Sequence, residues 1–362
     1  MKLTSAHILL TALPSALAYP SQPSAESDDD LYIEAGSHVI WSYPGLTPPE
    51  RLLELTKAGR VGGIILFGEN VDENIGDVVR QFQDAYASGP AYSGHPLLIM
   101  TDQEGGKVRR LPGGPEMTAK EIGESPQPIL TAAKAGNEAA DVLKTYNNNV
   151  NLGPVLDVWR TPENFLNKVG RSFSNDSLLV AGCSTAFLVA QQAAGVVATA
   201  KHFPGLGAAK DENTDLQQVT IDLPLEEIRA VDELPYISAI AAGVDMVMTS
   251  WAIYPSLDPE RPAGMSKAWV QDELRKRLRF RGVTVTDALE AVSLEPFGND
   301  AQRGFLAAQA GVDLLLASAR NATQGEAVLE ALVQGLKDGS LSKEEFREGT
   351  KRIERLRKKL RF

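Results

Sequence analysis

Cysteine and histidine are scarce in this 362-residue chain, which has one cysteine and four histidines. A single cysteine excludes disulfide bonds within the chain, so the hydrophobic core must supply the stability of the fold. Outside the N-terminal segment the histidines are His38, His95 and His202, and none of them is spaced as a metal-ligand pair. We therefore expect no zinc or other metal site and no cofactor.

Several familiar signatures are also missing from the sequence. It has neither the Gly-x-Ser-x-Gly elbow of serine hydrolases nor a Walker-type nucleotide loop. The formal net charge of −11 argues against nucleic acid or an anionic membrane as a partner. The longest apolar stretch, residues 178–200, is interrupted by Gln191, Gln192 and Gly195. It is better explained by a buried helix followed by a buried strand than by a membrane span.

The N-terminus has the pattern of a secretory signal peptide. A lysine, a short apolar run and a small-residue site ending at Ala18 predict cleavage after residue 18. A buried N-terminal helix is the alternative, but the run is short and leads into prolines and three consecutive aspartates. We expect residues 1–18 to be a signal peptide, residues 19–30 to be a disordered leader and the mature protein to be secreted. Secretion would make Asn175 and Asn321 candidate glycosylation sites.

Short β-rich segments recur along the chain and are separated mostly by helical patterns. Their apolar character is mostly continuous, as in strands that are covered on both faces. We predict an α/β fold in which residues 31–362 form a single (β/α)8 TIM-type barrel domain. A doubly wound open sheet is the alternative, but it needs fewer strands. The eight predicted strands are His38–Trp41, Gly63–Phe67, Leu97–Thr101, Val150–Leu156, Val196–His202, Asp245–Ser250, Gly282–Thr286 and Val312–Ala317.

The pair Lys201-His202, at the end of the fifth predicted strand, is the sharpest chemical signal. Adjacent residues on a strand face opposite sides. The following Pro204, Gly205 and Gly207 predict that the strand stops here, which would free both side chains to reach into one pocket. A lone histidine is more often a satisfied core residue, but this pairing favours a functional role.

Asp287 directly follows the seventh predicted strand. A carboxylate at the C-terminal end of a barrel strand is well placed to be a nucleophile or a general base. The alternative is an N-cap for a helix that begins near Ala288.

Other polar residues follow other predicted strands. Asp102 and Arg110 flank the glycine pair at 105–106, which allows a tight turn of the backbone. Both side chains could therefore point into the same pocket and hold sugar hydroxyls. A structural ion pair is the alternative for these two. Arg171 follows the fourth predicted strand, and on its own this arginine does not indicate a function. Trp251, just past the sixth strand, is a candidate stacking platform for a sugar ring, or else an ordinary rim residue.

Taken together and in this order, these motifs resemble the single-domain members of glycoside hydrolase family 3, in the branch that resembles β-N-acetylglucosaminidases. The resemblance extends from about Gly36 to the C-terminus. It implies a retaining β-glycosidase with a carbohydrate substrate, with Asp287 as nucleophile. It also implies a sugar-binding set made of Asp102, Arg110, Arg171, Lys201 and His202. The matching segments are 63–67, 101–106, 153–157, 170–173, 201–205 and 286–287.

The chain departs from this branch in the loop at residues 205–215. The branch has an acid/base histidine there, whereas this loop has no histidine and several carboxylates. Asp215, or else Asp211 or Glu212, could donate the proton if Asp287 and enclosure raise its pKa. An enzyme that lost general acid catalysis would be slower by a factor of about 10² to 10⁴.

Three hypotheses follow from the sequence. The first is a secreted, exo-acting retaining β-glycosidase, with a specificity like that of β-N-acetylglucosaminidases or else for glucose or xylose units. The second is a sugar-binding barrel that has lost catalysis. The third is a structural or interaction protein that uses the barrel as a surface.

Overall fold

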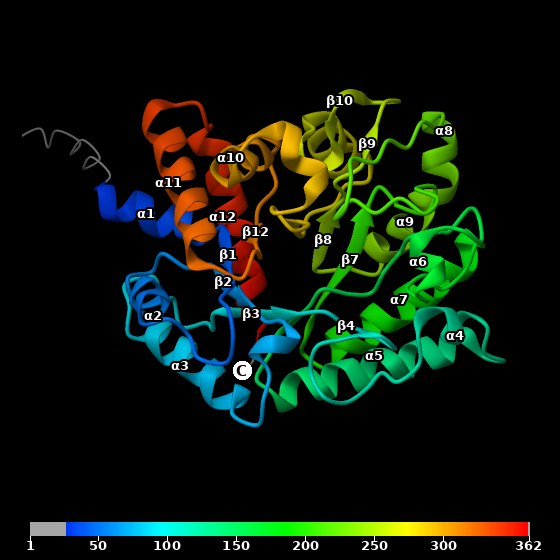
Figure 1. The fold of residues 1–362 in the computed structure, drawn as a ribbon, viewed down its shortest axis with the longest axis horizontal. Helices are drawn as coiled ribbons and strands as arrows, with labels where there is room; N and C mark the ends of the chain where they lie inside the picture. Colours follow the sequence, from blue (N-terminus) through cyan, green and yellow to red (C-terminus); the bar gives the residue numbers. More distant parts are fainter. Residues whose placement is uncertain (1–26, 361–362) are drawn as a thin grey trace, which may run out of the picture.

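Eight parallel strands form the centre of the molecule (Figure 1). The computed structural model describes residues 27–360. Neighbouring strands follow the order β11-β8-β7-β6-β3-β2-β1-β12, and a parallel bridge between Val285 and Leu314 joins the two ends of the sheet. The sheet is therefore a nearly closed barrel, and the predicted (β/α)8 fold is confirmed. Its strands are β1 (Val39–Trp41), β2 (Gly63–Ile65), β3 (Leu98–Thr101), β6 (Val150–Asn151), β7 (Val197–Phe203), β8 (Met246–Thr249), β11 (Val283–Thr286) and β12 (Leu315–Ala317).

Each barrel strand lies within or overlaps one of the predicted segments. The sequence did not predict two short hairpins that decorate the barrel, formed by β4 (Gln103–Gly105) with β5 (Val108–Arg109) and by β9 (Ile253–Tyr254) with β10 (Asp258–Pro262). Both hairpins follow the C-terminal ends of barrel strands, which is the side of a barrel where binding loops gather.

Helices surround the barrel, and Figure 1 shows α5 and α7 packed side by side along one flank. The α-helices are α1 (Asp28–Gly36), α2 (Glu50–Lys57), α3 (Ile75–Ala87), α4 (Ala119–Gly123), α5 (Pro128–Thr145), α6 (Phe165–Lys168), α7 (Ser177–Ala193), α8 (Leu225–Glu227), α9 (Leu234–Ala241), α10 (Asp300–Ala310), α11 (Ala322–Asp338) and α12 (Lys343–Arg357). A π-helical segment, η4 (Ala268–Arg277), connects β8 to β11, and a 3-10 helix, η5 (Val292–Phe297), precedes α10.

The last helix closes the N-terminal end of the barrel. Ile353 and Leu356 of α12, together with Leu360, belong to the same apolar cluster as inward-facing strand residues such as Ile40 and Met246. Because this end is sealed by packed aliphatic side chains, a ligand can enter the barrel only from the opposite end.

The first helix corrects one boundary. The leader is expected to be disordered through residue 30, but α1 begins at Asp28. The Ser27 side chain caps α1 by accepting a hydrogen bond from the Asp30 backbone N–H. Three aspartates in the first turn also stabilise the helix, because their negative charges lie at the positive end of the helix dipole. The predicted signal peptide and residues 19–26 of the predicted leader lie outside the described residues.

The apolar stretch at 178–200 folds as expected into a helix, α7, followed by a strand, β7. Cys183 is buried within α7. Among residues 27–360, no helix combines the length and the apolar composition that crossing a membrane requires. Asn175 and Asn321 are both exposed, and their glycosylation stays a prediction.

Candidate active site

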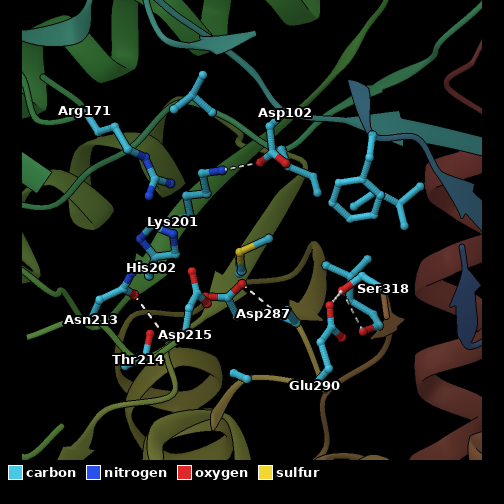
Figure 2. Close-up of a pocket in the computed structure, with 18 of the residues that line it drawn as sticks. Asp102, Arg171, Lys201, His202, Asn213, Thr214, Asp215, Asp287, Glu290 and Ser318 are labelled. Atoms are coloured by element: carbon cyan, nitrogen blue, oxygen red, sulfur yellow. Dashed lines mark hydrogen bonds and ion pairs between the residues drawn. The ribbon is translucent and has the colours of Figure 1, made fainter. Parts of the chain in front are cut away.

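A cavity of about 360 Å³ opens at the C-terminal ends of the barrel strands. Seven of the eight predicted site residues line it, and Figure 2 shows most of them pointing into it from opposite walls. The fold therefore brings these seven into one space. They are Asp102, Arg110, Arg171, Lys201, His202, Asp215 and Asp287.

The local geometry of β7 explains how two adjacent side chains reach this cavity. The strand does not end at His202 but continues through Phe203. Its register against β8 shifts between Ala200 and Phe203, and the peptide bond between Lys201 and His202 is cis. Because the register shift interrupts the ordinary alternation of a strand, both side chains line the cavity although each is buried.

Lys201 lies at the centre of a buried ion network. Its Nζ is 2.7 Å from Asp102 Oδ1 and 2.6 Å from Glu104 Oε1 (Figure 2). Arg171 donates two hydrogen bonds to Glu104, from Nε at 2.8 Å and from Nη2 at 2.7 Å. The network therefore joins the ends of β3 and β7 to the segment that follows β6, and it fixes the orientation of both cations.

The charges in this network stabilise one another. Burial opposes ionisation of Glu104, but Arg171 and Lys201 outweigh it and hold the pKa of that carboxyl well below its usual range. Burial likewise disfavours the charged forms of Lys201 and Arg171, yet the nearby carboxylates raise the pKa of both. All of these groups stay ionised at neutral pH, so the cavity has a floor of fixed, paired charges.

His202 is oriented by a buried carboxylate. Its Nδ1 lies 2.7 Å from Asp157 Oδ2, and Asp157 Oδ1 accepts a hydrogen bond of 2.7 Å from the Leu206 backbone N–H. Since an ionised carboxylate can only accept, Nδ1 carries the proton and donates it, which leaves Nε2 free for a ligand in the cavity.

Arg110 contributes an unused donor. Its backbone N–H donates to the Asp102 carbonyl at 3.2 Å, which places its side chain beside the ion network. Its Nε is buried and has no hydrogen-bond partner among residues 27–360. A buried donor without a partner is costly, and a sugar hydroxyl would satisfy it. The predicted alternative of an ion pair between Asp102 and Arg110 is wrong, because the partner of Asp102 is Lys201.

Asp287 lies at the end of β11 and faces the cavity. Its Oδ1 accepts a hydrogen bond of 2.8 Å from the Ala288 backbone N–H. No helix begins at Ala288, and the next helical segment along the chain is η5. The carboxylate therefore does not cap a helix, and it is left available for chemistry.

Asp215 is held beside Asp287 by its own backbone. The Asp215 carbonyl accepts from the Val292 N–H at 3.3 Å, and the Thr214 carbonyl accepts from the Ser293 N–H at 3.1 Å. These bonds tie the loop after β7 to the loop after β11, and Figure 2 shows the two carboxyl groups side by side.

The position of Asp215 changes its acidity. The residue as a whole is exposed, but its carboxyl faces the cavity, where desolvation and then the negative charge of Asp287 raise its pKa. Neither Asp211 nor Glu212 lines the cavity. Of the three loop carboxylates considered for proton donation, the fold brings only Asp215 to the site.

The prediction that Trp251 forms a stacking platform is wrong. Its side chain is only 1% exposed, packs against Gly264 and does not line the cavity. Its indole Nε1 donates a hydrogen bond of 2.8 Å to the Ala288 carbonyl. Trp251 therefore supports the segment that immediately follows Asp287 instead of contacting a ligand.

Sequence reasoning missed three acidic residues of the site. Glu104 binds Arg171 and Lys201, Asp157 binds His202, and both acidic residues lie in segments that carried the family resemblance. Glu290 lines the cavity and accepts a hydrogen bond of 2.8 Å from the Ser318 hydroxyl. Burial, supplemented by the charge of Asp287, raises the pKa of Glu290. The signal available for it was its position three residues after Asp287.

Within residues 27–360, no cluster of three or more histidine, cysteine, aspartate or glutamate side chains is arranged to hold a metal ion.

The chain matches the family described as the glycosyl hydrolase family 3 N terminal domain over residues 39–356. It is 56% identical over 332 residues to an "Uncharacterized secreted glycosyl hydrolase" of Arthroderma benhamiae, covering 91% of this chain and 94% of that protein.

Two solved structures are similar in fold and sequence. A family 3 β-N-acetylglucosaminidase from Paenibacillus sp. str. FPU-7 has a TM-score of 0.85 and 30% identity, and the match covers 91% of this chain but 62% of that one. A β-N-acetylhexosaminidase from Beutenbergia cavernae has a TM-score of 0.80 and 31% identity, and the match covers 91% of this chain and 98% of that one. The chain belongs to glycosyl hydrolase family 3, and it is a glycoside hydrolase.

Proposed function

We propose that this protein is a secreted, exo-acting retaining β-glycosidase that removes terminal β-linked sugars, with a specificity like that of β-N-acetylglucosaminidases. The observation that supports it best is the pairing of Asp287 and Asp215 in one cavity with the buried ion network. Retaining glycosidases need two such groups, one to attack the sugar and one to move a proton, and two carboxyls in these roles lie about 5 to 5.5 Å apart.

In the first step, an Asp287 carboxylate oxygen attacks the anomeric carbon. The glycosidic bond breaks, and Asp215 transfers its proton to the departing oxygen, so that the leaving group departs as a neutral alcohol. A raised pKa suits this role because it keeps Asp215 protonated at a pH where an ordinary aspartate is ionised.

In the second step, Asp215 is ionised and acts as a base. It removes a proton from a water molecule, whose oxygen attacks the anomeric carbon and releases Asp287. The sugar leaves with the β-configuration it had in the substrate, and both carboxyl groups return to their starting protonation states.

The ion network supports an exo mode of action. Asp102 and Lys201 line the cavity, and the Lys201 ammonium, which is held by Asp102 and Glu104, belongs to a side chain that is only 2% exposed. A cavity closed by these fixed charges suits the non-reducing terminal unit of a glycan. Charge-assisted bonds from Arg110, Arg171 and the network would hold its hydroxyl groups.

The specificity for N-acetylglucosamine rests on the similarity to the Paenibacillus β-N-acetylglucosaminidase and to the Beutenbergia cavernae β-N-acetylhexosaminidase. The test is to compare aryl β-N-acetylglucosaminide, β-glucoside and β-xyloside substrates and to follow the anomer first released by NMR. The proposal expects the N-acetylglucosaminide to be hydrolysed best, with the β-anomer formed first. Initial release of the α-anomer would contradict the retaining mechanism, and a preference for glucoside or xyloside would contradict the specificity alone.

Secretion is supported by the N-terminal sequence pattern and by the similarity to the secreted glycosyl hydrolase of Arthroderma benhamiae. Expression of the full chain in a secreting host should give a product in the medium that begins at Tyr19. Retention inside the cell with Met1 intact would contradict this part of the proposal.

A further inference from the structure

Positive charge is concentrated in two segments of this acidic protein. The chain has a formal net charge of −11, yet residues 275–281 and 351–359 hold eleven of its 36 lysines and arginines. The first segment leads into β11 and the second forms the end of α12. The fold brings them together at the N-terminal end of the barrel, opposite Asp287.

A second cavity, of about 290 Å³, lies between these segments. Arg279, Arg281 and Arg355 all line it and are all exposed. None of the three forms an ion pair with any residue in the part of the chain that the structure describes. Three guanidinium groups therefore surround one hollow without direct neutralisation.

Most other cations at this end of the barrel are already used. Arg275 and Arg352 both bind Asp313, at 2.6 and 2.7 Å, and thereby fasten η4 and α12 to the start of β12. Lys359 pairs with Asp245, the one acidic residue that lines this cavity. That pairing neutralises the carboxylate, so it does not compensate the three free arginines.

The arginines at this end of the barrel repel one another. Burial lowers the pKa of Arg275, and the charges of Arg352 and Arg281 lower it further in spite of Asp313. An anion bound between the arginines would relieve this repulsion. The net charge of the whole chain averages over the molecule and does not describe this face.

The shape and chemistry of the cavity suit one class of group. The buried apolar residues Val244 and Phe280 line it together with the three exposed arginines. Guanidinium binds phosphate and sulfate oxygens through two parallel hydrogen bonds, which is stronger and more directional than binding by an ammonium group.

We propose that the cavity bounded by Arg279, Arg281 and Arg355 binds the phosphate or sulfate group of a soluble ester. The ligand would dock at the end of the barrel opposite the glycosidase site, so both sites could be occupied at once.

The test is a calorimetric titration of the full-length mature protein with inorganic phosphate, inorganic sulfate and glycerol phosphate, at constant ionic strength and with acetate as the control anion. Arg281→Gln and Arg355→Gln should each weaken binding by about tenfold, which corresponds to one charge-assisted hydrogen bond. Both variants should keep wild-type glycosidase activity and thermal stability, because both residues are exposed and distant from Asp287.

The matched control is Arg51→Gln, an exposed arginine on α2 that is paired with Glu326. It should leave the anion affinity unchanged. The proposal is overturned if phosphate binds no better than acetate, if the cavity variants bind like wild type, or if the control loses as much affinity. If the protein bound vesicles that contain phosphoinositides but did not bind the soluble anions, the ligand of the cavity would be a lipid surface. That result would also overturn the proposal.

Discussion

Replacement of Asp215 by asparagine tests the assignment of the proton donor. The change keeps the size of the side chain and its place beside Asp287 but removes the transferable proton. General acid catalysis contributes a factor of about 10² to 10⁴, which is about 3 to 5.5 kcal/mol of transition-state stabilisation. We expect kcat/KM of Asp215→Asn to fall by this factor for substrates whose leaving group needs protonation. For a dinitrophenyl glycoside, whose leaving group departs as a stable anion, the loss should be below about tenfold.

The pH dependence gives an independent readout. Desolvation and the negative charge of Asp287 raise the pKa of Asp215, so its acid form persists to higher pH than that of an ordinary aspartate. In the wild type, kcat/KM should therefore decline on the alkaline side as Asp215 loses its proton in the free enzyme. In Asp215→Asn this alkaline decline should disappear, because no group remains to lose the proton.

The neighbouring carboxylates provide the controls for this assay. Asp211→Asn alters an exposed residue of the same loop that does not line the cavity, so it should retain activity with every leaving group. Glu290→Gln removes the other cavity carboxyl with a raised pKa. If either of these variants, and not Asp215→Asn, shows the leaving-group-dependent loss, the assignment of Asp215 is refuted.

Three further predictions concern the support of the site and the stability of the fold. Lys201→Met removes the ammonium that pairs with Asp102 and leaves the buried Glu104 with Arg171 alone, and it should destabilise the protein by about 3 kcal/mol in urea unfolding; an unchanged midpoint would contradict this. Trp251→Phe removes the indole donor that holds the Ala288 carbonyl next to Asp287, and it should lower kcat. Trp269→Phe, whose indole nitrogen has no partner among the described residues, should change kcat much less, and equal effects of the two substitutions would contradict the positioning role of Trp251. Burial raises the pKa of Asp232 to about 7 in spite of its ion pair with Arg160, so the folded state holds a proton there that the unfolded state releases near pH 4, and the contribution of this group to stability should fall as the pH rises from about 4 to about 7. Asp232→Asn should gain stability relative to wild type across that window, by at most about 4 kcal/mol, and a constant difference between the two proteins would disprove the raised pKa.

The barrel was predictable because its strands are short, apolar and regularly separated, so that each predicted segment contained or overlapped a strand. The convergence of Asp102, Lys201 and Asp287 followed from one rule, that the ends of parallel strands meet on one face. Periodicity gave no information on the two hairpins, since β4, β5 and β9 have only two or three residues each.

The contacts between loops could not be predicted in this way. The backbone bonds that hold Asp215 near Asp287 join residues far apart in the chain, and no local pattern encodes them. Trp251 was misjudged because its burial depends on the close approach of Gly264, which is also a tertiary contact. Glu104 has a charge typical of the surface, and only the positions of Arg171 and Lys201 explain its burial.

We propose above that Asp287 forms a covalent bond with the sugar. The most direct measurement is mass spectrometry of the intact protein, and then of its peptides, after incubation with a fluorinated glycosyl fluoride that slows hydrolysis of the intermediate. We expect a mass increase of one glycosyl unit, located on the peptide that contains Asp287. Turnover of aryl glycosides with no adduct on Asp287, or an adduct on a different carboxylate, would contradict it.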